Sequence, residues 1–108
     1  MMPEEDFVPV ISEGELKEGS MKLVNVVGRS ILLARQRGQV YGVSNRCPHM
    51  GCSLANGTLK EYIITCPCHG WSFDIRTGEY QKAKQLKLMT YECKIQEGKI
   101  YVKLLDEL

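Results

Sequence analysis

The chain has 108 residues, 44% hydrophobic and 25% charged, and this ordinary composition predicts one small folded domain over residues 1–108. Its formal net charge is +1, and the basic residues are scattered along the chain without a block of like charges. This pattern argues against a nucleic-acid-binding arm and against a basic membrane-binding face.

The beginning of the chain, MMPEEDF, is acidic and lacks the basic segment and apolar run of a secretion signal. No apolar stretch approaches the length that spans a bilayer. We therefore expect a soluble, cytoplasmic protein without a membrane span.

The first recognisable elements are three short β-rich runs. They cover residues 21–27, 31–36 and 39–43 and are separated by the turn-like sequences GRS and RG. This spacing predicts a meander of three strands.

Two boxes rich in cysteine and histidine follow the meander. RCPHMGCSL spans residues 46–54 and TCPCHGWSFD spans residues 65–74, and each box places a cysteine and a histidine around a proline. The candidate metal ligands in these boxes are Cys47, His49, Cys66 and His69.

Further strand-like runs come after the second box. WSFDI is followed by a turn at residues 76–78, by the run at 86–95 and by a final run at 99–105. In the final run Ile100 and Val102 fall on one face, which is the alternation of a half-buried strand. The chain is therefore predicted to be all-β, a small antiparallel sandwich or barrel whose two boxes lie on loops that converge at one end.

The spacing of the candidate ligands is C-x-H, sixteen residues, then C-x-x-H. Five cysteines would also suit a disulfide scaffold, but without an export signal their clustering beside both histidines favours a metal site. Thiolate and imidazole bind both zinc and iron. The tight C-x-H pair can direct its two side chains to different metal ions and favours iron, while a non-redox zinc-binding module remains the alternative.

Through CPH (47–49) and CPCHGWSFD (66–74) the sequence resembles the Rieske iron-sulfur proteins. The resemblance implies an all-β fold with a two-loop subdomain that binds a [2Fe-2S] cluster. It implies that the ligands divide between the two irons, with Cys47 and Cys66 on one and His49 and His69 on the other. The expected function is that of a soluble Rieske-type ferredoxin, which passes single electrons between redox proteins such as a reductase and a terminal oxidoreductase.

Catalysis by the chain itself is not expected. A Rieske oxygenase also needs a mononuclear iron bound by two further histidines and a carboxylate, and both histidines of this chain are already assigned to the cluster. An electron-transfer protein is therefore predicted rather than an enzyme. Two alternatives remain, a separately encoded Rieske subunit of a larger oxidoreductase of the oxygenase or nitrite-reductase type and, less favoured, a quinol-oxidising subunit.

The remaining cysteines and the sequence at the end of the second box resemble different branches of the family. Cys52 and Cys68 match the quinol-oxidising members, and that resemblance implies a disulfide between them. By contrast, HGWSFDIRTG (69–78) resembles the Rieske ferredoxins and the Rieske domains of ring-hydroxylating oxygenases. Cys93 is predicted to be a small buried hydrophobe.

Three lysines beyond the second box have two interpretations. They form either a solvated edge or a docking patch for an acidic redox partner. These residues are Lys82, Lys84 and Lys87.

Overall fold

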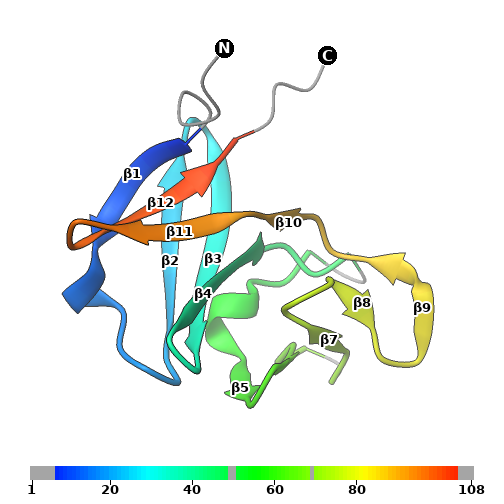
Figure 1. Ribbon diagram of the computed structural model, residues 1–108. Coiled ribbons are helices and arrows are strands. Elements are labelled where there is room, and N and C mark those ends of the chain that lie inside the picture. The colour runs from blue at the N-terminus through cyan, green and yellow to red at the C-terminus, as the bar shows by residue number, and fades with distance from the viewer. Residues whose placement is uncertain (1–6, 49–50, 69, 105–108) are drawn as a thin grey trace.

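The computed structural model describes residues 7–48, 51–68 and 70–104, which form antiparallel β-sheets and two short 3-10 turns (Figure 1). The first group of elements is β1 (Phe7–Ser12), η2 (Glu13–Glu15), β2 (Met21–Val26), β3 (Arg29–Gln36) and β4 (Gln39–Ser44). The second group is η3 (Leu54–Asn56), β5 (Thr58–Lys60), β6 (Ile63–Thr65), β7 (Ser72–Asp74), β8 (Glu79–Tyr80) and β9 (Ala83–Lys87). The chain returns through β10 (Thr90–Tyr91), β11 (Cys93–Gln96) and β12 (Lys99–Lys103). Within the described ranges no helix is long and apolar enough to cross a membrane.

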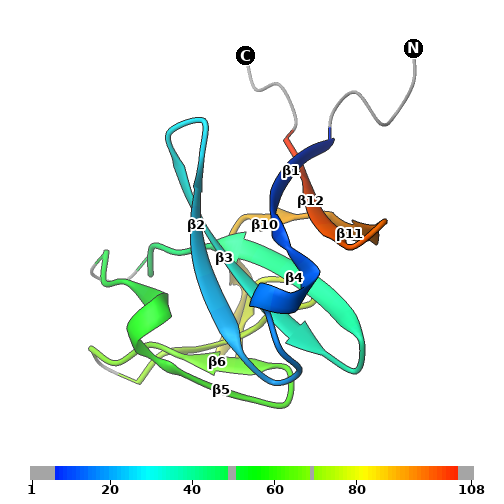
Figure 2. The same cartoon turned by 90° about the vertical axis from the view of Figure 1, so that its left-hand side faces the viewer.

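The strands of the described residues form three sheets. A central sheet has the order β10-β4-β3-β2, an outer sheet has the order β1-β12-β11, and a small sheet has the order β5-β6-β7-β8-β9. Figures 1 and 2 show the central sheet between the outer sheet, where the two ends of the described chain meet, and the small sheet. The all-β prediction is confirmed, as are the three strands of the predicted meander, which form β2, β3 and β4.

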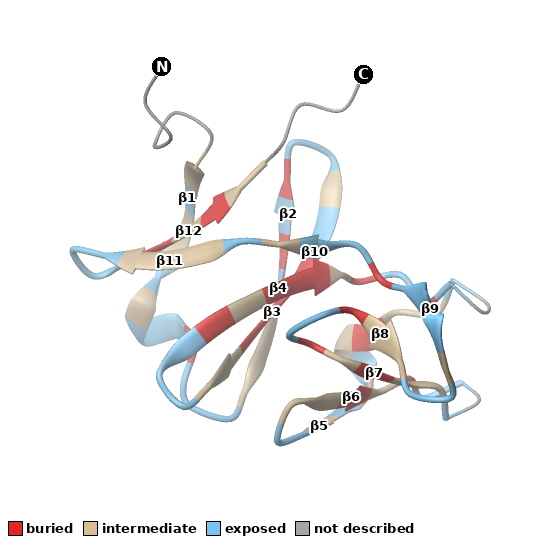
Figure 3. Ribbon diagram, turned by 45° about the vertical axis from the view of Figure 1, so that its right-hand side comes forward, coloured by how far each residue is buried: buried red, intermediate tan, exposed pale blue. Residues whose placement is uncertain are grey.

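Strand β3 is buried on both faces, which explains its continuous apolar run, ILLA. Ile31 and Leu33 point into a core shared with the outer sheet, and Leu32 and Ala34 point into a second core shared with the small sheet. Figure 3 shows buried segments along β3 and β4, in the middle of the molecule. The small sheet carries the second box between β6 and β7, and the first box precedes it between β4 and η3. This sheet is therefore packed onto the rest of the protein through its own core.

The run at 86–95 differs from its prediction as one strand. Its first residues end β9, Thr90 and Tyr91 form β10 on the edge of the central sheet, and Cys93 begins β11 in the outer sheet. The segment passes from the small sheet to the other two, and Leu88 is buried where it crosses. Sequence alternation describes a single sheet face, so it does not reveal a segment that changes sheets.

Candidate metal centre

The first box forms a closed loop between β4 and η3. The N–H of Cys47 donates to the carbonyl of Cys52 (2.9 Å), and the N–H of Gly51 donates to the carbonyl of Cys47 (2.7 Å). Gly51 has a φ of +72°, a left-handed conformation that glycine adopts without strain. The loop is closed further by a bridge between Arg46 and Ser53.

The second box, between β6 and β7, repeats this backbone frame. The N–H of Cys66 donates to the carbonyl of Trp71 (2.7 Å), and the N–H of Gly70 donates to the carbonyl of Cys66 (3.1 Å). Gly70 has a φ of +75°. In both loops the first cysteine is therefore bonded to the residues four and five positions later, and the two cysteines occupy equivalent places.

The side chains of these equivalent cysteines are buried. Cys47 is 1% exposed and Cys66 is 2% exposed, and both belong to the core of the small sheet with Leu54, Ile64 and Phe73. Neither takes part in the disulfide. The frame thus holds two thiol groups on the inner side of two matching loops.

A disulfide between Cys52 and Cys68, the pair that the resemblance implies, joins the two loops in the structure, with 6.5 Å between their Cα atoms. The Sγ atoms of Cys52, Cys66 and Cys68 all lie within 4.8 Å of one another. These three sulfurs do not form a metal site by themselves, because two of them are bonded to each other and a metal ligand must be a thiolate. The Cys66 thiol instead lies beside the covalent link between the loops.

Asn45, directly before the first box, fixes the base of its loop, a role that the sequence interpretation missed. The residue is only 8% exposed. Its side-chain oxygen accepts the N–H of Ala55 (2.9 Å), its side-chain amide donates to the Ser53 hydroxyl (2.8 Å), and its own N–H donates to the carbonyl of Ser30 (3.0 Å). Asn45 therefore ties the loop to η3 and to the central sheet. A polar residue between a predicted strand and the box was the available signal.

An aromatic cluster supports the second loop. The Trp71 ring stacks on Tyr80, with 4.2 Å between the ring centroids and 10° between the planes. The fully buried Phe73 ring lies 5.5 Å from the same tyrosine. At the base of the loop the hydroxyls of Thr65 and Ser72 are 3.1 Å apart and share a hydrogen bond. Strand β8 is therefore held against the end of this loop.

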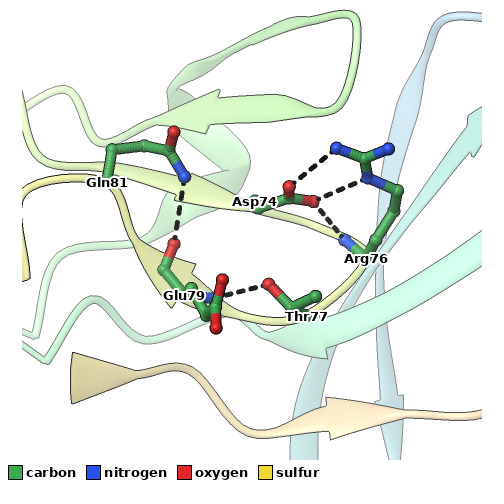
Figure 4. A network of polar contacts seen from close by, with 5 residues as sticks. All are labelled: Asp74, Arg76, Thr77, Glu79 and Gln81. Carbon is green, nitrogen blue, oxygen red and sulfur yellow. Dashed lines mark hydrogen bonds and ion pairs between the residues drawn. The ribbon is translucent and has the colours of Figure 1, made fainter. Parts of the chain in front are cut away.

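The turn that leads to β8 is organised around a carboxylate (Figure 4). Asp74 accepts hydrogen bonds from the backbone N–H (2.8 Å), Nε (3.0 Å) and Nη2 (2.8 Å) of Arg76. The side-chain hydrogen bond from Arg76 is the main cause that lowers the pKa of Asp74, and burial opposes it. The Thr77 hydroxyl then accepts the N–H of Glu79 (3.2 Å), at the start of β8. This turn sets the direction in which β8 and Tyr80 return to the loop.

Comparison with known proteins identifies the family. A family model of the Rieske [2Fe-2S] domain matches residues 6–92. The chain belongs to the Rieske family. The expected [2Fe-2S] cofactor is thereby confirmed, because the cluster defines this domain.

Individual relatives of this Rieske chain differ greatly in length. Ferredoxin CarAc of Metapseudomonas resinovorans is 32% identical over 98 residues, which cover 89% of this chain and 92% of CarAc. Apoptosis-inducing factor 3 of Homo sapiens is 32% identical over 90 residues, which cover 82% of this chain but only 15% of that protein. A similar solved structure is a chain from a complex of reduced oxygenase and oxidized ferredoxin in carbazole 1,9a-dioxygenase. The two chains are 30% identical and superpose with a TM-score of 0.82, and the match covers 94% of this chain and 98% of the solved chain.

The side chains of the two Rieske loops include the thiol donors that a [2Fe-2S] cluster requires. Two buried thiols in equivalent positions would supply the thiolate half of the ligand set, and the disulfide removes the other two loop cysteines from competition. His49 and His69 lie outside the described residues, so their assignment as ligands remains a prediction.

Cys93 is not part of the Rieske site. It lies in β11 against the core that the outer and central sheets share, and its Sγ donates to the carbonyl of Tyr91 (3.5 Å). Burial, with a smaller contribution from Glu92, raises the pKa of this thiol to about 12. Cys93 packs against the core as the predicted small hydrophobe would, but it is partly rather than fully buried.

Proposed function

We propose that this chain is a cytoplasmic one-electron carrier of the Rieske ferredoxin type, with residues 1–108 acting as a single domain. In this proposal Cys47 and Cys66 bind one iron of the cluster and His49 and His69 bind the other. A bound Rieske cluster takes up and gives back a single electron without transforming a substrate.

The observation that carries the proposal is the matched pair of loops. Each loop holds a buried cysteine in the same hydrogen-bonded frame, and the Cys52–Cys68 disulfide fixes one loop against the other. The contribution of the protein is to keep these thiols positioned and shielded from water, since a rigid site needs little rearrangement when its charge changes.

The proposed partners are a reductase that supplies the electron and a terminal oxygenase that receives it. Similarity to a named ferredoxin over nearly its whole length supports this assignment. Similarity to a chain of a solved oxygenase–ferredoxin complex supports it as well. In this reading the chain delivers electrons and the oxygenase performs the chemistry.

Metal and sulfide analysis, combined with electron paramagnetic resonance, tests the proposal. We expect two irons and two sulfides per chain and, after reduction with dithionite, the low average g value of a Rieske cluster. Zinc without iron, or a reduced protein without this signal, would contradict the proposed function.

A further inference from the structure

The segment from Tyr80 to Tyr91, which includes β9, is bonded at both of its ends to the loops of the cluster site. At one end the Tyr80 ring stacks on Trp71, and the N–H of Gln81 donates to the carbonyl of Ser72 (2.9 Å). At the other end the carbonyl of Met89 accepts the N–H of Ser44 (2.8 Å), three residues before Cys47. Residues 80–91 therefore flank the site, and we call them the basic segment.

Charge is distributed unevenly between this end of the protein and the rest. The two loop regions, residues 44–57 and 65–73, together with the basic segment contain four of the 14 basic residues and none of the 13 acidic residues. The rest of the chain holds 10 basic and 13 acidic residues, so its formal charge is negative. The two loop regions and the basic segment thus carry four basic residues without an acidic one, and Glu79 and Glu92 directly flank the segment in the chain.

The lysines of the basic segment are available for an external partner. Strand β9 is the last strand of the small sheet, and Figure 3 shows it exposed at the margin of the molecule. Lys82, Lys84 and Lys87 are all exposed, and the ion pairs found among the described residues involve only Arg35, Arg37 and Arg76 as cations. No carboxylate of the described chain therefore forms an ion pair with these three lysines, although Glu79 lies opposite Lys87 in the sheet and Lys84 contributes to the lowered pKa of Asp74.

Exposed apolar side chains distinguish this surface from a merely solvated edge. Lysines on an edge strand can also serve only to prevent that strand from pairing with another sheet, and this role requires charge but no exposed apolar side chains. Leu86 is 37% exposed and lies between Lys84 and Lys87 in the chain, and Met89 is 51% exposed and lies two residues after Lys87. Apolar contact area surrounded by charge of one sign is typical of a transient protein interface, where the charges guide the encounter.

We propose that the basic segment is the docking surface for the acidic face of a redox partner protein. This inference rests on the proposed function and specifies the chemistry of the partner. Opposite charge would draw the two proteins together with the partner facing the cluster end, and Leu86 and Met89 would supply the close contact.

Charge reversal tests the proposal in the cluster-loaded protein. The variant Lys82→Glu/Lys84→Glu/Lys87→Glu is compared with the control Lys17→Glu/Lys60→Glu/Lys99→Glu, which changes three other exposed lysines and gives the same net charge. The probe is a reduced, acidic plant-type [2Fe-2S] ferredoxin, whose lower potential drives electron transfer to a Rieske cluster. Stopped-flow absorbance gives the second-order rate constant, and voltammetry of each variant checks that the driving force is unchanged.

At low ionic strength we expect the first variant to lose roughly tenfold or more in rate and the control to lose roughly twofold or less. The difference should disappear at about 1 M salt, where charges are screened within about 3 Å. With basic cytochrome c as electron acceptor, the first variant should react faster than the wild type. Equal losses in both variants would overturn the docking surface, whereas a wild-type protein that dithionite does not reduce would overturn the proposed function.

The apolar part of the surface has a separate test. Leu86→Ser/Met89→Ser should slow the reaction with the acidic ferredoxin by roughly threefold or more, without changing its salt dependence. Leu23→Ser is the control, because Leu23 is 44% exposed on β2, in another sheet. An effect of equal size in the control would show that Leu86 and Met89 do not belong to the interface.

Discussion

The cysteines outside the disulfide lie in two different environments, and their substitution should have different consequences. Cys66→Ser removes one of the two buried thiols of the loops, so we expect the cluster to be lost. Cys93→Ser is the matched control, since this thiol lies in the other core and its pKa of about 12 keeps it protonated. Iron content and visible absorption measure the outcome. Full iron content in Cys66→Ser would contradict the ligand assignment.

The Asp74 carboxylate should make stability depend on pH in the acid range. Its pKa lies below the ordinary value of 3.8, mainly because Arg76 donates to it. A lowered pKa in the folded state stabilises the protein above the unfolded-state pKa, and this stabilisation is lost as the pH falls through the folded-state pKa. The difference in unfolding free energy between wild type and Asp74→Asn should therefore be constant above about pH 5 and shrink below about pH 4. A difference independent of pH would contradict this role.

Single residues of the site were predictable where their chemistry is distinctive. Cys47 and Cys66 stand out because a thiol beside a histidine has few structural reasons to be there. Asn45 was missed because asparagine is common in loops, and its value depends on partners from η3 and the central sheet that only the fold brings near.

Close packing of η3 against β6 depends on a residue without a side chain. A Cβ at Gly57 would lie 2.0 Å from the carbonyl oxygen of Thr65, so alanine would force apart η3 and the strand that leads to Cys66. Gly57→Ala should lower the unfolding free energy by about 1–3 kcal/mol. Gly14→Ala is the control, because nothing lies within 4 Å of its Cβ. Urea unfolding measures both, and equal stability of the two variants would refute the close contact.

Strands were predictable where one sheet face determines their pattern. Alternation located β12, whose Ile100 and Val102 are fully buried, and turn signals located the meander. Strands β5 and β6 were not identified, since elements of three residues carry too little periodicity to be recognised. Strand β6 pairs with β7, which follows the second box in the chain, and β5 pairs with β6.

Across the whole molecule, the family was predictable from the resemblance that the two boxes carry, and the fold class was predictable from the strand-like runs. The number of cores was not predictable, because the sequence of β3 is one apolar run although its two faces belong to different cores. The positive charge near the cluster site was not predictable either, because it combines segments that are far apart in the sequence. Both properties arise from the topology.

Two separate cores predict a localised response to loss of the cluster. Cys47 and Cys66 belong to the core of the small sheet, whereas the outer sheet packs on the opposite face of β3. We expect hydrogen exchange in the cluster-free Cys66→Ser variant to accelerate at least about tenfold in β5 to β9, corresponding to about 1.4 kcal/mol, and to change little in β1, β11 and β12. Mass spectrometry would compare this variant with cluster-loaded Cys93→Ser. A similar acceleration in all three sheets would mean that the molecule behaves as one cooperative unit and that the second core does not protect the outer sheet.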